Sequence, residues 1–267
     1  MKDRFKRQGF LGEAGQRAIE RVRVAICGLG GGGSILAVLL AHLGVLDFVL
    51  FDGDVAEAWN LNRTITLTEA DITAHSLKVN AAERRIKEIR SAARVEKYDC
   101  CWQDRPEVLR GCDVAFGSID GFQGRDELEK TCRRFLLPLI DLGMDVRTLK
   151  GHRPRMAGQV ILSMPGEACM WCMGFLDDQK MALEDQRYGD AGDNPQVVWA
   201  LSHLASSAVG IFVNLLTDWT GSLRERVHLV YRGNEGTINP CRRLPYVPRE
   251  CPHHPLDQVG EPRLRAV

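Results

Sequence analysis

The chain has 267 residues, of which 45% are hydrophobic and 26% are charged. This length and composition fit one large α/β domain. Its 35 basic residues balance its 35 acidic ones, and this neutral balance argues against a dedicated nucleic-acid-binding protein, which usually carries a basic excess on one face.

Neither a membrane segment nor an export signal is expected. No apolar run approaches the roughly 20 residues needed to span a bilayer. The first ten residues, MKDRFKRQGF, are charged and lack the apolar stretch of a secretory signal. Nine cysteines in a chain without an export signal favour reduced thiols and a cytoplasmic protein over a disulfide framework.

The first half of the chain alternates strand-like and helix-like patterns. This alternation predicts a doubly wound, mostly parallel sheet of the Rossmann-like kind. In chain order we expect a polar helical lead-in at 1–21, a strand at about 22–27, a glycine turn, the buried helix SILAVLLAHL, a strand at 47–52, a helix at 75–90, short strands at RVEKYD, DVAFGSID and LPLIDLGM, and the helix QGRDELEKTCRRF between the last two.

The pattern changes after about residue 144. The stretch DVRTLKGHRPRMAGQVILSMPG predicts one or two antiparallel strands in the C-terminal half. A cysteine pair follows, then an acidic polar loop at about 177–194, a long apolar helix beginning near Pro195, a strand LRERVHLVYRG, and a Pro-rich tail that carries cysteine and histidine. Because nothing marks a linker, we expect a single domain over 1–267.

The stretch ICGLGGGGS, residues 26–34, indicates a phosphate-binding turn. Gly28, Gly30 and Gly33 have the G-x-G-x-x-G spacing after an apolar strand, which suits a dinucleotide but also any pyrophosphate or triphosphate at a helix start. Asp52 ends the second strand 19 positions after Gly33, where an NAD site keeps its ribose-binding acid. Up to this point a dehydrogenase fits.

Charged residues beyond the second strand favour a triphosphate. Arg63 and Lys78 follow that strand's carboxyl end, on the side where ligands bind in open α/β sheets. A displaced pyrophosphate needs such cations, whereas a dinucleotide rests on backbone N–H groups. Asp120 ends a later strand and is placed to hold Mg²⁺ among the phosphates. Singly, each could be a solvated group or a cap, and their ordered placement is what indicates ATP.

These features resemble the E1-like adenylating enzymes, the family that includes the ThiF and MoeB proteins and the adenylation domains of ubiquitin-type E1 enzymes. The resemblance runs from about residue 4 to 254. It is carried by GLGGGGS at 28–34, D-G-D-V at 52–55, N-L-N-R at 60–63, Lys78, S-I-D at 118–120 with Arg125 following, and Arg7-Gln8 near the start.

The resemblance implies a role for each matching position. Arg7 would reach into the site of a partner protomer, since bacterial members are usually homodimers, and would act in catalysis with Arg63, Lys78 and Asp120. The attacking carboxylate is already ionised at neutral pH, so no general base is required. The residues implied in nucleotide binding are Gly28, Gly30, Gly31 and Gly33, Asp52 on the ribose, Asp54, Asn60, Arg63 and Lys78 around the phosphates, and Asp120 through Mg²⁺.

A cysteine pair and the tail predict a structural zinc site. Cys169 and Cys172 form a C-x2-C knuckle, and the tail supplies Cys251 and His254. Four such ligands suit tetrahedral Zn²⁺ and leave no open position for water, whereas the alternative is a set of free thiols. The family often carries two C-x-x-C pairs here, so the histidine is a departure. The rivals of His254 as the fourth ligand are His253 and Cys241.

The resemblance also bears on the C-terminal half. Ubiquitin-type E1 enzymes use a further cysteine as a thioester, often after the first zinc pair, but no cysteine lies between Cys172 and Cys241, and none is assigned. The acidic loop would cross over the carboxyl tail of a bound protein. The expected parts are an N-terminal helical segment at 1–21, a nucleotide-binding half at 22–144, and a half at 145–267 with the crossover loop, zinc knuckle and dimer helix.

The leading functional hypothesis is ATP-dependent adenylation of the C-terminal carboxylate of a ubiquitin-like protein with a glycine tail. The product would pass to an E2-like conjugation partner or to a sulfur-transfer partner. A second hypothesis changes the acceptor to a peptide carboxylate or a modified tRNA base, and the neutral charge counts mildly against tRNA. An NAD-binding oxidoreductase and a non-catalytic E1-like scaffold are further alternatives, which the phosphate-site residues disfavour.

Overall fold

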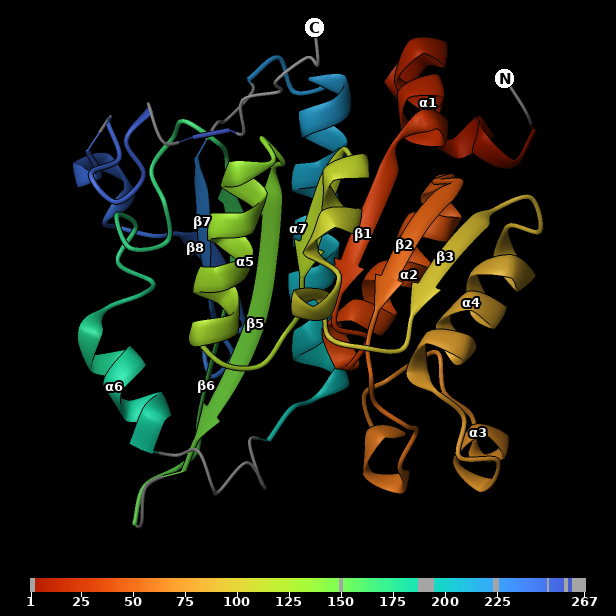
Figure 1. Cartoon of the computed structure of the whole chain (residues 1–267), viewed down its shortest axis with the longest axis horizontal. Helices are drawn as coiled ribbons and strands as arrows, with labels where there is room; N and C mark the ends of the chain where they lie inside the picture. The colour runs from red at the N-terminus through yellow and green to blue at the C-terminus, as the bar shows by residue number, and fades with distance from the viewer. Residues whose placement is uncertain are drawn as a thin grey trace, which may run out of the picture.

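One sheet runs through the protein and carries both halves of the chain (Figure 1). The structure is a computed structural model and describes residues 3–148, 151–186, 195–222, 226–248, 250–256 and 259–260. The eight strands lie in the order β3-β2-β1-β4-β5-β6-β7-β8. They are β1 (Arg23–Cys27), β2 (Asp47–Phe51), β3 (Arg94–Tyr98), β4 (Val114–Gly117), β5 (Leu139–Arg147), β6 (Arg155–Ser163), β7 (Val227–Arg232) and β8 (Thr237–Pro240).

The sheet is parallel from β3 to β5 and antiparallel from β5 to β8. This confirms the predicted fold class, a Rossmann-like sheet with antiparallel strands added in the C-terminal half. The central strand β1 is covered on both faces of the sheet. Val24 and Ile26 pack into the core on one face, and Ala25 and Cys27 pack into the core on the other. Strands of a covered parallel sheet are apolar on both sides for this reason.

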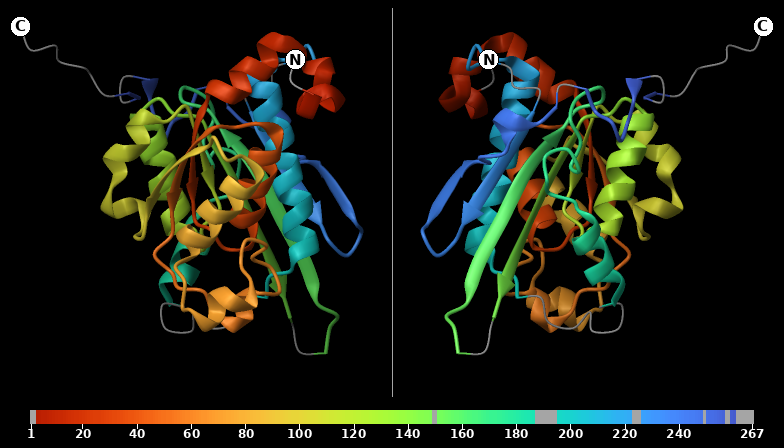
Figure 2. Two further views of the ribbon diagram at one scale, coloured as in Figure 1. Left: turned by 90° about the vertical axis from the view of Figure 1, so that its right-hand side faces the viewer. Right: turned by 90° about the vertical axis from the view of Figure 1, so that its left-hand side faces the viewer.

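Helices cover both faces of the sheet (Figure 2). The helices α2, α4 and α7 line one face, where their apolar residues join one core cluster, and α5 packs on the other face. The α-helices are α1 (Gly12–Arg21), α2 (Gly31–Leu43), α3 (Glu69–Thr73), α4 (Lys78–Ile89), α5 (Gln123–Arg134), α6 (Asp178–Gln186) and α7 (Val198–Thr217).

The helix α7 departs from one expectation. Its 20 residues are long and apolar enough to cross a membrane by length and composition alone, so the expectation that no apolar run approaches this length is wrong. In the structure α7 packs on α2, β5 and β6, and Leu201, Leu204 and Phe212 lie fully or almost fully buried in the core. One such helix is weak evidence for a membrane span, because the core helix of a globular domain has the same composition.

Some predicted elements begin or end elsewhere. The helical lead-in is a 3-10 helix, η1 (Asp3–Leu11), kinked at Gln8 and followed by α1. The glycine turn continues directly into α2, whose first residue is Gly31. The first part of the expected acidic loop forms α6, whereas 187–194 lies outside the described residues.

The N-terminal segment is anchored at the far end of α2 from the glycine turn. Phe5 is buried, and Gln8 Nε2 donates to the carbonyl of Leu43 at 2.9 Å. Gly44, at φ +119°, leaves room for the Phe5 ring, because a Cβ there would lie 2.9 Å from it. Figure 1 shows the N-terminus and α1 at one end of the parallel strands and α3 at the other.

Candidate nucleotide and metal sites

The glycine turn after β1 is shaped by contacts that exclude side chains. Gly28 has φ +88°, and a Cβ there would lie 2.3 Å from the carbonyl oxygen of Ser118; a Cβ on Gly33 would lie 1.8 Å from the carbonyl oxygen of Gly28. Nothing lies within 4 Å of a Cβ built on Gly30, the residue before α2. The N-terminus of α2 therefore opens onto free space with no acid in its first turn, which suits a phosphate.

Asp52 ties the glycine turn to the end of β2. Its Oδ2 accepts the N–H of Leu29 at 2.6 Å, and its Oδ1 accepts the N–H of Asp54 at 2.9 Å. Burial raises the pKa of Asp52, while the charge of Lys78 lowers it. The sequence predicted Asp52 as a ribose ligand, and in the structure it also holds the shape of the turn.

Lys78 lies at the start of α4 beside these acids. Its Nζ is 2.5 Å from Asp54 Oδ2 and 3.8 Å from Asp52 Oδ1, and its side chain is only 9% exposed. Of the two acids, Asp54 is the one that a ligand could replace, because its side chain is 72% exposed. A buried ammonium group paired with an exposed carboxylate is available to a phosphate group that replaces this carboxylate.

Arg63 and Asn60 belong to the segment between β2 and α3. Arg63 Nη1 donates to the carbonyl of Trp59 at 2.7 Å, and its buried Nε has no partner among the described residues. The Cβ of Arg63 lies 3.3 Å from the position that a Cβ on Gly31 would take, so this arginine borders the glycine turn. Asn60 is buried, and its Oδ1 accepts the N–H of Glu57 at 3.1 Å, which shapes the loop.

Asp120 lies beside the glycine turn, because Ser118, two residues earlier, contacts Gly28. Its carboxylate is exposed and accepts a hydrogen bond from Gln196 Nε2 at 3.1 Å. The open turn, the unpaired Arg63 Nε and an exposed carboxylate fit a magnesium–nucleotide complex. Asp120 would hold the metal ion.

Arg7 is not brought to this site. It is exposed on η1, whose neighbour Gln8 contacts the carboxyl end of α2. A helix of 13 residues is about 20 Å long at 1.5 Å per residue. Arg7 is therefore anchored too far from its own glycine turn for its side chain to reach it.

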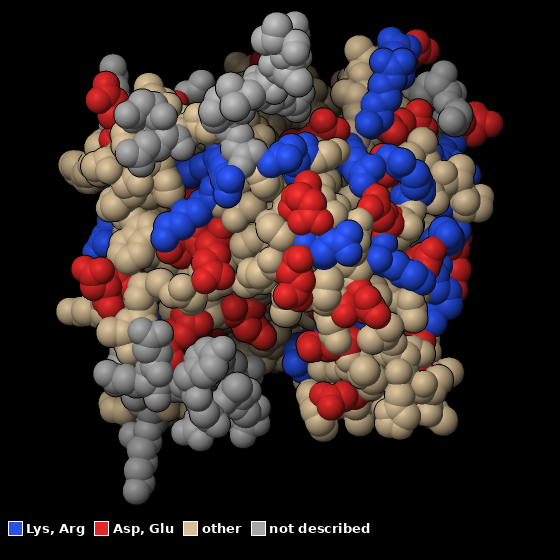
Figure 3. All heavy atoms as spheres, viewed as in Figure 1, with Lys and Arg blue, Asp and Glu red and all other residues tan. Residues whose placement is uncertain are grey.

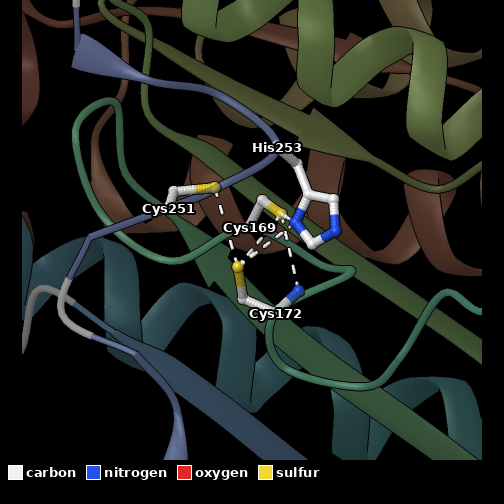
Figure 4. A group of neighbouring side chains, drawn as sticks. All are labelled: Cys169, Cys172, Cys251 and His253. Atoms are coloured by element: carbon white, nitrogen blue, oxygen red, sulfur yellow. Dashed lines mark hydrogen bonds between the residues drawn. The ribbon is translucent and has the colours of Figure 1, made fainter.

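Three cysteines and a histidine form the second site (Figure 4). The ligating atoms of Cys169, Cys172, Cys251 and His253 all lie within 4.8 Å of one another. Cys172 Sγ is 3.6 Å from the Sγ atoms of both other cysteines, and His253 Nδ1 is 3.4 Å from Cys169 Sγ and Cys172 Sγ. Zinc–sulfur bonds of about 2.3 Å in a tetrahedron place two sulfurs about 3.8 Å apart, so these separations fit Zn²⁺.

The fourth position of this cluster goes to His253 and not to His254, the ligand we expected. The ring of His254 points instead to Glu129 and Cys169, and its buried Nε2 has no hydrogen-bond partner among the described residues. Burial lowers the pKa of His254 to about 4. Adjacent residues in a turn direct their side chains differently, which the spacing of cysteine and histidine in the sequence cannot resolve. Cys241 does not belong to the cluster.

Sequence reasoning missed Glu129, which supports the knuckle. The carboxylate of Glu129 is fully buried. Its two oxygens lie 2.9 and 3.1 Å from the nitrogen of Met170, whose N–H they accept. It also accepts a hydrogen bond from the hydroxyl of Ser163 and lies 3.6 Å from Arg133. Burial raises its pKa, while Arg133 lowers it. Arg125, Glu129 and Arg133 are spaced four apart on α5, and this row of charges on one helix face was the available signal.

The fold and the first site are those of an α/β nucleotide-binding protein with cations beside its glycine turn, and a separate Cys/His cluster could hold a metal ion. Its sequence matches the model of the ThiF family over residues 5–230. The chain belongs to the ThiF family, as the resemblance in its motifs predicted.

Curated relatives carry names of activating enzymes. Ubiquitin-like modifier-activating enzyme 5 of Dictyostelium discoideum is 27% identical over 170 residues, covering 58% of this chain and 42% of that protein. Sulfur carrier protein ThiS adenylyltransferase of Bacillus subtilis is 31% identical over 130 residues (47% and 39%). SAMP-activating enzyme E1 of Haloferax volcanii is 28% identical over 179 residues (64% and 61%). The chain thus spans between 39% and 61% of the length of these relatives.

Solved structures share the fold. Escherichia coli MccB with ATP has a TM-score of 0.73 at 18% sequence identity, covering 90% of this chain and 71% of that one. PaaA has a TM-score of 0.69 at 20% identity, covering 89% and 81%. At such identities the likeness concerns the fold and says nothing of the substrate.

Proposed function

We propose that this protein uses ATP and Mg²⁺ to adenylate the C-terminal carboxylate of a ubiquitin-like or sulfur-carrier protein that ends in a glycine tail. The observation that carries this proposal is the placement of Asp120, Arg63 and Lys78 around one glycine turn. Membership of the ThiF family and the names of the relatives support the same reaction.

The proposed chemistry needs charge and position and no proton transfer. The carboxylate of the substrate attacks the α-phosphate, pyrophosphate leaves, and an acyl-adenylate forms. The backbone N–H groups at the start of α2 bind phosphate oxygens, and Lys78 and Arg63 balance the charge that develops on the leaving group. When bound at Asp120, Mg²⁺ supplies further positive charge to the same group.

In this scheme Asp54 forms an ion pair with Lys78 until the nucleotide binds. Before ATP binds, its carboxylate keeps the nearly buried ammonium group paired, because a buried unpaired charge is costly. A phosphate oxygen that replaces it keeps the charge balanced. Asp52 continues to hold the turn through the N–H of Leu29, and its ribose contact stays a prediction.

A homodimer completes the proposed site, since Arg7 cannot reach its own. A partner's η1 would bring Arg7 to the phosphates. The outer side of α7 supports a contact between copies, because Trp199 is 58% exposed and a cavity of about 430 Å³ lies between α7 and β7, lined by residues such as Ile211, Leu215 and Val227. Large apolar surfaces on globular proteins often mark such contacts.

The zinc cluster has a structural part in this proposal. Cys169, Cys172, Cys251 and His253 would close the coordination sphere of Zn²⁺ and fasten the tail to the knuckle. No described cysteine at the nucleotide site has a lowered pKa; burial raises that of the exposed Cys101 thiol near Asp52 and Asp54. We therefore assign no thioester cysteine, and transfer to an E2-like or sulfur-transfer partner in the cytoplasm remains part of the proposal.

A peptide carboxylate is the second candidate acceptor, because it offers the same attacking group to the α-phosphate as the C-terminus of a carrier protein does. A modified tRNA base is less favoured. Figure 3 shows acidic and basic side chains interspersed over the side of the molecule that Figure 1 turns to the viewer, without a basic stripe on that side.

The nucleotide decides between this proposal and an oxidoreductase. We expect ATP with Mg²⁺ to raise the melting temperature more than NAD does, because the cations beside the turn suit a triphosphate. The Asp120→Ala variant should lose ATP–pyrophosphate exchange with candidate carrier proteins by at least about a hundredfold and keep its fold. Stabilisation by NAD equal to that by ATP, or full exchange by the variant, would contradict the proposal.

A further inference from the structure

The turn that carries Asp120 is held from the outside by a residue of α6. Glu184 accepts the N–H groups of Phe122 and Gln123, the latter at 3.0 Å. These N–H groups stand at the start of α5, which has no capping side chain of its own at Phe122. The first turn of a helix needs acceptors for its free N–H groups, and a carboxylate is the strongest available.

The glycine that follows Asp120 makes this contact possible. Gly121 has φ +82°, and a Cβ there would lie 2.0 Å from Glu184 Oε1. A side chain at position 121 would therefore displace the carboxylate of Glu184. The contact needs both the glycine and the glutamate. The turn and α6 are more than sixty residues apart in the chain.

Aromatic and cationic side chains seat α6 on the same turn. The rings of Phe122 and Phe175 lie 5.8 Å apart, and Lys180 Nζ is 5.9 and 5.6 Å from their centroids. On the inner side, Arg125 is buried, pairs with Asp141, and donates from Nη2 to the carbonyl of Ile119 at 2.6 Å. The turn is thus fixed on one side by the core and on the other by α6.

A second contact reaches Asp120 itself from beyond α6. Gln196, shortly before α7, donates to Asp120 Oδ1 at 3.1 Å. Residues on both sides of the 187–194 segment therefore contact the turn. The backbone contact of Glu184 fixes where the turn lies, and the contact of Gln196 bears on where the carboxylate points.

We infer that Glu184 is a positioning residue for the metal ion: by holding the N–H groups of Phe122 and Gln123 it keeps Asp120 in the orientation that binds Mg²⁺, and so makes metal binding depend on the seating of α6. This inference rests on the proposed function, because it takes Asp120 as the metal ligand. Glu184 touches neither nucleotide nor metal in this account. Its effect passes through three consecutive peptide groups.

The inference predicts a selective loss. The affinity for ATP can be measured with and without Mg²⁺. In the proposed site, only the gain in affinity that Mg²⁺ brings depends on Asp120. We expect Glu184→Ala to reduce the ratio of ATP affinities with and without Mg²⁺ by at least about tenfold, because one charge-assisted hydrogen bond contributes that much and Glu184 accepts two. Affinity for ATP without Mg²⁺ should stay unchanged. A residue with a general structural role would lower both affinities together.

The measurement is calorimetric titration of zinc-loaded protein with ATP, first in buffer freed of divalent ions by a resin and then with added Mg²⁺. A resin is used because a soluble chelator would remove zinc from the cysteine cluster. Glu184→Gln keeps an acceptor oxygen and should recover most of the ratio. Asp178→Ala removes the same charge from the exposed first turn of α6 and should leave the ratio at the wild-type value.

Two results would overturn the inference while leaving the proposed function intact: an unchanged ratio in Glu184→Ala, or an equal loss in Glu184→Ala and Asp178→Ala. Wild-type protein whose ATP affinity does not respond to Mg²⁺ would instead contradict the proposed function, and the inference with it. A normal ratio in Glu184→Gln together with a reduced ratio in Glu184→Ala supports it.

Discussion

Asp141 illustrates what a single buried carboxylate does in this fold. It is fully buried on β5 and forms an ion pair with Arg125, which in turn binds the carbonyl of Ile119. Among the described residues, its Oδ1 has no hydrogen-bond partner. Burial raises the pKa of Asp141 to about 6, although the charge of Arg125 opposes this rise. The inner support of the Asp120 turn therefore depends on a carboxylate that takes up a proton more readily in the folded state.

This shift predicts a pH dependence with a definite sign. The native state binds a proton near pH 6, whereas the unfolded chain binds it only near its ordinary pKa of about 4. Between these values acidification favours the native state, so the free energy of unfolding should rise by about 1 kcal/mol from pH 7 to pH 5 relative to Asp141→Asn. Urea unfolding of both proteins at the two pH values measures the difference. A relative loss of stability on acidification would show that the pKa is not raised.

Local sequence signals pointed to some residues of the candidate site, whereas others depend on long-range contacts. Gly28, Asp52 and Lys78 could be predicted because each has a fixed relation to one strand end. The contact of Glu184 with the Asp120 turn could not, because it joins residues more than sixty positions apart through backbone N–H groups, which leave no mark in side-chain pattern. The pairing of Lys78 with Asp54 was hidden for a similar reason, since an acid near a turn also reads as a cap.

At the scale of elements, the knuckle is held from two directions. Its cysteines meet Cys251 and His253 of the tail, and the N–H of Met170, inside the knuckle, is held by the buried Glu129 of α5. Residues beside metal ligands fix their orientation in this way. The knuckle therefore joins three segments that are far apart in the sequence.

The cluster predicts a metal content that depends on one histidine. Protein purified without chelator should contain about one Zn²⁺ per chain, because four protein ligands close a tetrahedral site. His253→Ala should lower zinc content and melting temperature, and Cys172→Ser should do the same. His254→Ala is the matched control and should keep its zinc. Elemental analysis with thermal melting checks both points; zinc lost from His254→Ala and kept by His253→Ala would restore the ligand set expected from the sequence.

The elements with a clear apolar pattern were predictable, and those without one were not. The strands β1, β2 and β4 follow from buried apolar runs, and α7 follows from its length. The helix α6 was expected as a loop because most of its nine residues, DQKMALEDQ, are polar or charged, and α3 has only five residues. Such elements are stabilised by their contacts with the rest of the protein more than by their own sequence.

At the scale of the whole molecule, the two ends of α2 lie in different functional regions. Its first residues form the phosphate turn, and its last residues anchor η1 through Leu43 and Gly44. The helix thus fixes a separation of about 20 Å between Arg7 and the site of its own chain. If Arg7 acts on a nucleotide, as we propose, it must therefore act on the one bound to another copy, where its charged, planar group suits phosphate oxygens.

Subunit mixing tests this arrangement. Arg7→Ala and Asp120→Ala should each be inactive alone, and a mixture should recover about a quarter of wild-type pyrophosphate exchange, because random pairing gives half mixed dimers with one intact site each. Native mass spectrometry confirms that subunits exchange. If mixed dimers form and activity does not return, Arg7 does not act across a dimer.

The single sheet has a consequence for how the protein loses its structure. β5 pairs with β4 at its start and with β6 along its whole length, so it crosses the boundary that we expected at residue 144 between the two halves. Neither half can then melt without breaking hydrogen bonds of the other, and we expect unfolding to be one cooperative event. By mass action, any ion or ligand that binds only the folded chain stabilises all of it. Loss of zinc from the tail would therefore lower the number of folded molecules that can bind nucleotide. The nucleotide sites of the molecules that stay folded would be unaltered.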